Sequence, residues 1–290
     1  MKPKRIPWIS YTVILLGSVI MIFPFLDMVF SSFKGSAEYS KLQYSLLPES
    51  FAFDNYRTAF EQLQLGLLFK NSITRSVAIT LLVLLTSSLG GYVLAKLRFP
   101  GKKLIFRFVL STMMFPTFLF FIPNYYITVH FPLVGGNNIF GEGGYGGLAA
   151  SIAGLIVPFA VSGFGIFLMR QFIMNIEDAY IESARLDGAG ELRIFFQIIL
   201  PMTVPALATL AIFEFIASWN EFIWALLMNS VNQELATLPV GIQTLKLHLD
   251  PALTQPLVMA GLVIATVPIL VLFLFLQKYY VRGMMNDGLK

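Results

Sequence analysis

The hydrophobic pattern of the chain consists of long apolar runs separated by short polar segments. Six runs are long enough to cross a bilayer, because about 20 apolar residues in a helix span its hydrocarbon core. They lie at about residues 8–33, 73–95, 108–129, 148–169, 205–228 and 256–276. A stretch at 55–64 predicts a short helix outside the membrane. The pattern therefore predicts an all-α, polytopic membrane protein with six transmembrane helices.

Composition supports this class. The 290 residues are 57% hydrophobic and only 12% charged, whereas soluble domains carry about 25% charged residues. The absence of Cys excludes disulfides, thiolate metal sites and a Cys nucleophile. His130 and His248 are far apart and lack metal-ligand spacing, so we expect loop residues and no metal site. No catalytic or nucleotide-binding motif is present, and we expect a protein that is not itself an enzyme.

The main polar segment lies at 175–201, between the fourth and fifth runs. Its pattern predicts two short helices, with Asn175 as the first N-cap and Asp187-Gly188 as the stop between them. Five residues are expected to share one apolar face of the first helix: Ile176, Ala179, Tyr180, Ser183 and Leu186. The second repeats the helical spacing with Leu192, Phe195, Phe196 and Ile199. Pro201 and Pro205 mark the return into the bilayer.

The distribution of positive charge predicts the orientation. With the N-terminus inside, 14 of the 20 Lys and Arg residues fall in internal segments. The others, Arg75 among them, fall in external segments or at their edges. Internal loops of membrane proteins are enriched in Lys and Arg. Both termini and the 175–201 segment are therefore expected in the cytoplasm.

Residues 182–189 (Glu-Ser-Ala-Arg-Leu-Asp-Gly-Ala), with Phe195, Ile198 and Leu200-Pro201, carry a family resemblance. They resemble the EAA loop of permease subunits from bacterial ATP-binding-cassette importers. Within that superfamily, the motif is similar to that of the carbohydrate importers of the maltose or oligosaccharide type. Among their two permease subunits, it resembles the second-permease group. Ser183 departs from the pattern, which usually has Ala there. An amphipathic hairpin on the membrane surface is the alternative interpretation.

The resemblance implies a single permease domain over residues 1–290, in a bacterial inner membrane, containing a cytoplasmic coupling loop at 175–201. It implies as partners a second permease, giving a heterodimer, two ATPase subunits and an extracytoplasmic solute-binding protein. ATP and Mg would be bound by the ATPase, and no cofactor by this chain. The residues expected to couple to the ATPase are Glu182, Ser183, Ala184, Asp187, Gly188, Ile199, Leu200 and Pro201. For Gly188 and Pro201, a structural role is an equal or better alternative.

The fifth run contains polar residues that are costly in a membrane. Glu214, Ser218 and Glu221 fall at i, i+4 and i+7, and hence on one helix face. Intramembrane charges indicate a water-filled pathway or a paired interior site. The candidates for contact with a sugar are Asn124, Tyr125, Tyr126, Glu214, Ser218, Trp219, Asn220 and Glu221. The alternatives are that these groups join helices to one another or to the partner permease, and that the partner makes the main solute contacts.

A glycine-rich segment at 135–147 precedes the fourth run. It lacks the Gly-Lys-Ser/Thr ending of a phosphate-binding loop and is expected to be an external loop. It either contacts a partner or is simply flexible. For the whole chain, the alternative functions are the same machine carrying a polyol or glycerol phosphate ester, an ion-coupled carrier working alone, and a membrane enzyme. The solute itself is not encoded in any motif of the sequence.

Overall fold

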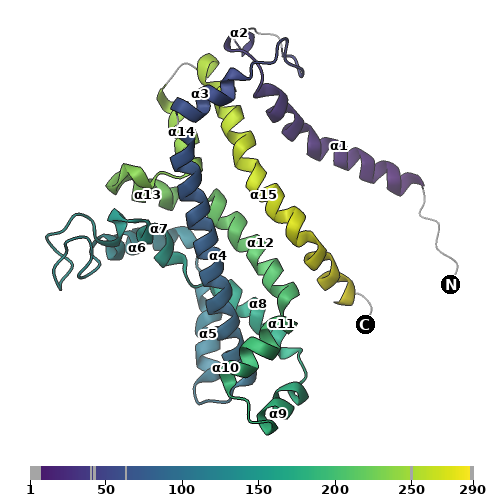
Figure 1. The fold of residues 1–290 in the computed structure, drawn as a ribbon, viewed down its shortest axis with the longest axis vertical. Coiled ribbons are helices and arrows are strands. Elements are labelled where there is room, and N and C mark those ends of the chain that lie inside the picture. The colour runs from purple at the N-terminus through teal and green to yellow at the C-terminus, as the bar shows by residue number, and fades with distance from the viewer. Residues whose placement is uncertain (1–7, 40, 42–43, 63, 249–250, 288–290) are drawn as a thin grey trace. The chain divides into compact units, whose positions relative to one another are not determined.

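A computed structural model describes residues 8–39, 41, 44–62, 64–248 and 251–287. These residues form helices and loops, without a strand (Figure 1). They group into two compact units, one of residues 1–66 and 241–268 and the other of residues 67–240 and 269–290. The basic residues ahead of Trp8 lie outside the described residues. The single domain expected over residues 1–290 stays a prediction.

The first unit contains α1 (Trp8–Ser31), α2 (Ser36–Tyr39), α3 (Asp54–Gln62), most of α14 (Leu238–His248) and the first part of α15 (Pro251–Asp287). The α3 helix confirms the short helix predicted at 55–64. Asn55 at its start donates from its amide to the carbonyls of Ser32 and Lys34, at 2.9 Å each. These bonds fix α3 against the segment that follows α1, and the apolar side chains along α1 suit contact with lipid.

The second unit contains nearly all of α4 (Leu65–Lys96) and the bent helices. These are α5 (Lys102–Thr112), α6 (Phe121–Val129), α7 (Ile152–Ile156), α8 (Gly163–Met174), α9 (Asp178–Leu186), α10 (Glu191–Ile194), α11 (Leu200–Met202), α12 (Val204–Asn220) and α13 (Ile223–Val231). Short 3-10 turns cover Thr117–Phe120, Gly147–Ala150, Val157–Phe159 and Gln233–Leu235. A π-helical turn, Phe195–Ile199, joins α10 to α11.

Three of the apolar runs are unbroken helices, α1, α4 and the apolar part of α15. Three more crossings are present if each bent pair of helices counts as one span. The bends are 99° between Lys102–Thr112 and Thr117–Val129, 45° between Ile152–Phe159 and Gly163–Met174, and 77° between Glu191–Met202 and Val204–Asn220. The expected continuous fifth span at 205–228 is wrong in one respect, because α12 ends at Asn220 and α13 begins at Ile223.

Polar side chains on α4 pair with backbone groups at two irregular places, the turn before α14 and the break before α8. Asn71 donates to the carbonyls of Glu234 and Ala236, and the Ser72 hydroxyl accepts from the backbone N–H of Leu238. Thr86 donates to the carbonyl of Ala160, at the break before α8 (3.0 Å). An unpaired peptide group costs several kcal/mol in hydrocarbon, about 4–8 in the most apolar reference. The polar positions of α4 therefore explain how broken helices persist in this unit.

Close backbone contact joins α4 to α8. A Cβ added at Gly91 would lie 2.8 Å from the Met169 Cβ and 2.9 Å from the Arg170 nitrogen. A Cβ at Gly165 would lie 2.3 Å from the Ser87 hydroxyl oxygen. Small residues let membrane helices approach in this way. This contact holds α8, and the helices that follow it, against α4.

Candidate functional site

The first helix of the polar segment begins later than the sequence predicts. Helix α9 starts at Asp178, with Glu177 in the N-cap position, and Asn175 is instead the C-cap of α8. The prediction of Asn175 as N-cap is wrong because its backbone N–H bonds back to the Phe172 carbonyl (3.2 Å). The end of α8 therefore uses the residue that local preference assigns to the start of α9.

The end of α9 agrees with the predicted stop. Gly188 has φ of +80°, a conformation that glycine adopts at little cost. Its N–H donates to the Arg185 carbonyl (3.0 Å), and the Ala189 N–H donates to the Ala184 carbonyl (2.9 Å). These two bonds form a Schellman motif, which closes the helix and turns the chain toward α10.

The apolar face predicted for α9 is wrong in its direction. Ile181 and Ala184 are buried, whereas Tyr180 and Leu186 are 51% and 90% exposed. In the segment that follows, Ile194, Phe195 and Ile199 are buried in the core shared with α4 and α8. Leu192 and Phe196 remain 69% and 49% exposed. The four exposed side chains Tyr180, Leu186, Leu192 and Phe196 are called the apolar tip below.

The residues predicted to couple to an ATPase divide into two groups. Glu182, Ser183, Asp187, Gly188 and Pro201 are exposed. Ala184 and Ile199 are buried in this chain's own core, and Leu200 is half-buried against it. The close packing predicted for Ala184 therefore takes place inside the chain, and the contact of the exposed group with another subunit stays a prediction.

Ion pairs fix α9 and α10 to each other and to α4. The Lys96 ammonium donates to the Asp178 carboxylate (2.6 Å) and to the Ile176 carbonyl. Arg185 pairs with Glu191 (2.8 Å), whose carboxylate also accepts from the Tyr92 hydroxyl. The hydrogen bond from Lys96, with its positive charge, lowers the pKa of Asp178. These ion pairs therefore hold in place the helices α9 and α10, on which most of the apolar tip lies.

A cavity of about 530 Å³ lies farther along the same unit. Its polar lining consists of Arg75, Thr112, Thr117, Asn124, Ser162, Glu214, Ser218 and Glu221. Its aromatic lining consists of Phe115, Phe120, Phe159 and Phe164. The bends at 113–116, 160–162 and 221–222 border it, and these bends bring the polar groups to one place. Four predicted pathway residues, Asn124, Glu214, Ser218 and Glu221, meet here.

Arg75 is the residue at this site that sequence reasoning missed. Its side chain is 2% exposed and pairs with the Glu221 carboxylate at 3.0 Å. It also donates to the backbone carbonyls of Ser218 (2.5 Å) and Leu155 (3.3 Å), and it lies over the Phe159 ring. The charge count treated Arg75 only as a residue at an external edge, which stays a prediction, and it gave no sign of this buried ion pair. One signal was available, because Arg75 lies inside the predicted second span.

Glu221 closes the break between α12 and α13. Its carboxylate accepts from the backbone N–H groups of Trp224 (2.5 Å) and Ala225 (3.2 Å), in addition to pairing with Arg75. These contacts tie α4, α12 and α13 together through one carboxylate. Of the two alternatives for Glu221, the geometry favours the joining of helices over direct contact with a solute.

Comparison with known proteins decides the family. The sequence pattern of the family described as "Binding-protein-dependent transport system inner membrane component" matches residues 87–286. The chain is 32% identical to the arabinooligosaccharides transport system permease protein of Halalkalibacterium halodurans, over 100% of both chains. The chain belongs to this family.

Other relatives of this inner membrane component differ in solute. It is 30% identical to the diacetylchitobiose uptake system permease protein of Streptomyces coelicolor (98% of this chain, 89% of that one). It is 28% identical to the sn-glycerol-3-phosphate transport system permease protein of Pectobacterium atrosepticum (96% and 95%). A solved bacterial ABC transporter involved in alginate import has the same fold, with a TM-score of 0.78 at 22% identity over 94% of this chain and 95% of that one. The all-α polytopic fold and the permease class predicted from the sequence are confirmed.

The remaining pathway candidates of this inner membrane component lie outside the cavity. Trp219 is buried, with its ring against Phe69 and Phe215. Tyr125 packs on the core around Trp224. Two more do not border the cavity and are exposed, Tyr126 and Asn220. These four residues do not line this cavity, and their contact with a solute stays a prediction.

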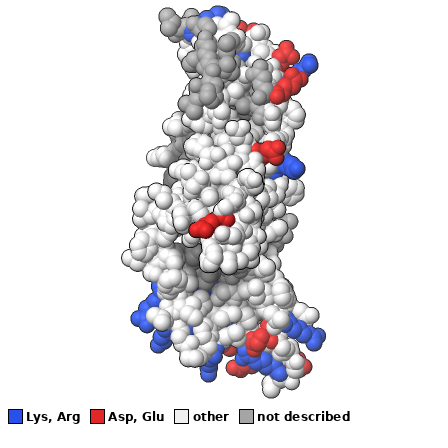
Figure 2. Space-filling view, turned by 90° about the vertical axis from the view of Figure 1, so that its left-hand side faces the viewer, with Lys and Arg blue, Asp and Glu red and all other residues white. Residues whose placement is uncertain are grey.

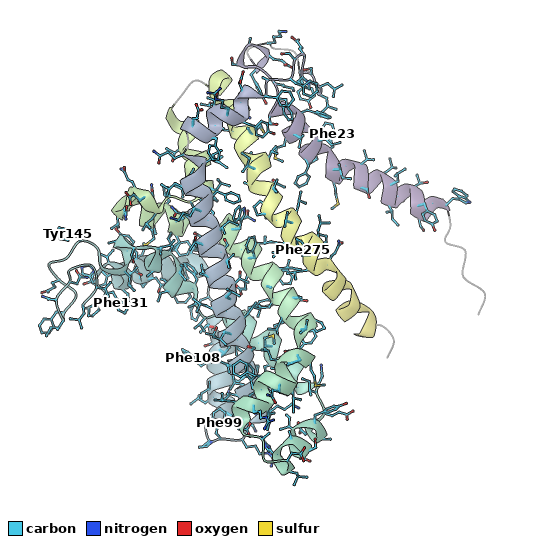
Figure 3. All side chains as sticks on the ribbon, in the orientation of Figure 1. Phe23, Phe99, Phe108, Phe131, Tyr145 and Phe275 are labelled. Carbon is cyan, nitrogen blue, oxygen red and sulfur yellow. The ribbon has the colours of Figure 1, made fainter. Side chains whose placement is uncertain are left out.

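The glycine-rich loop is an ordered structure. The Asn137 amide donates to the carbonyls of Val129 and Phe131 and accepts from the Gly144 N–H. A Cβ added at Gly144 would lie 2.4 Å from the Asn137 nitrogen, so the fold of the loop requires glycine there. Tyr145 lies at its exposed surface (Figure 3). Between the two alternatives for this loop, the turns argue against simple flexibility, while contact with a partner stays a prediction.

Proposed function

We propose that this inner membrane component is one permease subunit of an ATP-driven importer for a neutral sugar or oligosaccharide. Two of the relatives are permeases for arabinooligosaccharides and diacetylchitobiose, which supports a carbohydrate solute. The family description supports dependence on a solute-binding protein. In this assembly the chain works with a second permease, two ATPase subunits that bind ATP and Mg, and an extracytoplasmic binding protein. Both termini and α9 face the cytoplasm.

The observation that carries the proposal is the apolar tip. Its four side chains are exposed on α9 and on the segment that follows it, and exposure of apolar side chains to water is unfavourable unless a partner covers them. The ion pairs of Lys96 and Arg185 hold the backbone beneath them. We propose that the tip inserts into the ATPase subunit, with the exposed Glu182 supplying a polar contact at its edge. Closure of the ATPase then moves α9 and, through α8, the wall of the cavity.

The cavity wall fits a neutral hydroxylated solute. Carboxylate, amide and hydroxyl groups, here Glu214, Asn124 and Ser162, accept from and donate to sugar hydroxyls. Phenylalanine rings such as Phe120 suit the apolar faces of a sugar. Arg75 is the cation that lines this cavity, and Glu221 already neutralises it. A phosphate ester would therefore meet the carboxylate of Glu214 without an unpaired cation among the described residues that line this cavity.

A substitution in the tip tests the coupling role. In Leu186→Asp, we expect the ATPase to be lost when the complex is purified through a tag on this chain, because a charge replaces the most exposed apolar side chain of the tip. Leu133→Asp is the matched control, since Leu133 is also a highly exposed leucine but lies just before the glycine-rich loop, away from α9 in the sequence. Full ATPase retention in Leu186→Asp would contradict the proposal.

Uptake assays test the solute class. Liposomes containing the complete complex are expected to accumulate a neutral oligosaccharide, and Glu214→Gln is expected to weaken this uptake while the complex stays assembled. Uptake of sn-glycerol-3-phosphate in preference to every neutral sugar tested would contradict the proposed class. Transport without ATP would contradict the importer mechanism itself.

A further inference from the structure

A second hollow, of about 640 Å³, lies between the start of α5 and the end of α8. Its lining is Lys102, Lys103, Phe106, Arg107 and Arg170, without an acidic residue. Within the described residues, none of these four cations forms a salt bridge. In Figure 2, Lys and Arg gather at the lower end of the view together with Asp and Glu, and Figure 1 places α9 and α10 at that end. The hollow therefore concentrates positive charge that the chain itself leaves uncompensated.

Two of the cations are held in place by neighbouring groups. The Arg170 guanidinium lies 3.9 Å from the centre of the Phe106 ring and donates to the Leu94 carbonyl (3.1 Å). Lys102 donates to the carbonyls of Ala95 and Leu97, at 3.0 and 2.9 Å. The 11-residue helix α5 also begins here, at Lys102, and its N-cap residue Gly101 provides no side-chain cap. Its free N–H groups and helix dipole add to the positive potential.

The other two cations lie at the rim of the hollow. Lys103 and Arg107 are exposed and, four residues apart, share a face of α5. Beside them on the same helix, Leu104 and Phe108 are 67% and 69% exposed (Phe108 is labelled in Figure 3). A row of cations next to a row of exposed apolar side chains matches a molecule with an anionic head and a hydrocarbon tail.

We propose that this hollow binds the phosphate group of an anionic phospholipid from the leaflet on the α9 side, which is cytoplasmic under the proposed topology. The phosphate oxygens accept from Lys103, Arg107 and the fixed Arg170, and the acyl chains lie along Leu104 and Phe108. Basic pockets between membrane helices on the cytoplasmic side suit such head groups. Arg contributes paired donors in a plane that matches phosphate oxygens. The apolar row favours a lipid over a protein surface as the occupant.

The test uses the complete complex in micelles containing equal amounts of phosphatidylglycerol and phosphatidylcholine. Lipid retained after exchange into lipid-free detergent is counted by native mass spectrometry. Wild type is expected to retain phosphatidylglycerol selectively. Lys103→Gln/Arg107→Gln should weaken it roughly thirtyfold, because each basic group near an anionic surface contributes about a fivefold factor. Arg193→Gln is the matched control, since Arg193 is an exposed cation on α10 that donates to Gln197 instead.

Further arms separate the possible sources of the anion. Millimolar inorganic phosphate is expected to leave the bound lipid in place, because the apolar row holds the acyl chains. Displacement of the lipid by phosphate would overturn the lipid assignment in favour of a free anion. Equal retention of the two lipids by wild type, or unchanged retention in the double variant, would overturn the site. Loss of the ATPase from the double variant, with its lipid still bound, would instead assign the cations to a protein contact.

Discussion

Glu221→Ala is expected to destabilise the second unit strongly. The substitution removes one carboxylate that both pairs with Arg75 and accepts hydrogen bonds from the start of α13. The Arg75 guanidinium, only 2% exposed, keeps its charge but loses the anion at 3.0 Å. The backbone N–H groups of Trp224 and Ala225 lose the acceptor that begins α13. The side chain of Glu221 is itself only 17% exposed, so water replaces it incompletely.

The magnitude follows from the burial of the pair. Removing one partner of a buried ion pair costs about 3–5 kcal/mol, because the remaining charge is uncompensated. Arg75 keeps two acceptors, the carbonyls of Ser218 and Leu155, which places the ionic part near the lower limit. Loss of the group that accepts from the first turn of a helix adds about 1 kcal/mol. We expect a total of about 4 kcal/mol.

The assay is unfolding by SDS titration in mixed micelles, followed by tryptophan fluorescence. Trp224 is fully buried and donates from its indole to the Gly154 carbonyl (2.9 Å), so its emission reports the loss of this region. Glu182→Ala is the control, because Glu182 is exposed. Arg75→Met and the double variant complete a thermodynamic cycle. An unfolding free energy for Glu221→Ala within about 0.5 kcal/mol of wild type, or strict additivity in the cycle, would refute the reasoning.

Three other substitutions test the backbone contacts and the ion pair beside α9. Gly91→Ala should lower thermal stability by about 1–3 kcal/mol, because its Cβ would meet the α8 backbone at 2.9 Å; Gly17→Ala, with nothing within 4 Å, should not lower it. Gly188→Ala should cost about 1–2 kcal/mol at φ of +80°, seen as faster amide exchange at the end of α9, and unchanged exchange would contradict the argument. The lowered pKa of Asp178 means that its pairing with Lys96 contributes stability fully above pH 3.8 and loses it as pH falls through the folded-state pKa. Asp178→Asn should remove that part of the stability profile at acidic pH, and an unchanged profile would exclude the pair as its cause.

The sequence predicts those parts of the fold that depend on nearby residues. The lengths of the apolar runs define the spans, and Pro116 and Pro205 lie at two of the bends. Gly188 defines the end of α9, since its φ of +80° follows from a local turn. For α9 itself, helical periodicity does not predict which side is buried, because apolar residues occur on two sides of the helix. Ile181 packs on the core and Leu186 faces outward, and a periodicity argument expects only one such face.

The cavity depends on contacts between distant residues, and this is why its prediction is incomplete. Arg75 donates to carbonyls 80 and 143 positions away, at Leu155 and Ser218, so neighbouring residues contain no sign of its burial. Glu214, Ser218 and Glu221 do meet at one cavity, although a continuous helix was assumed. Glu221 has left the helix, with ψ of 126°. The spacing of these three residues still predicted that they share one side of the helix, because the helix continues as far as Asn220.

The glycine contact between α4 and α8 also affects how completely a movement of α8 is passed on to α4. Long side chains between two helices absorb a small shift by changing rotamers. Helices whose backbones touch cannot absorb a shift in this way. Residues 175–177 alone separate α8 from α9. Under the proposed coupling, a displacement of α9 would reach α4 with little loss, because the close contacts at Gly91 and Gly165 leave almost no space between the helices. Under the same proposal, a larger residue at either position would change how much of that displacement is transmitted, even where the fold survives.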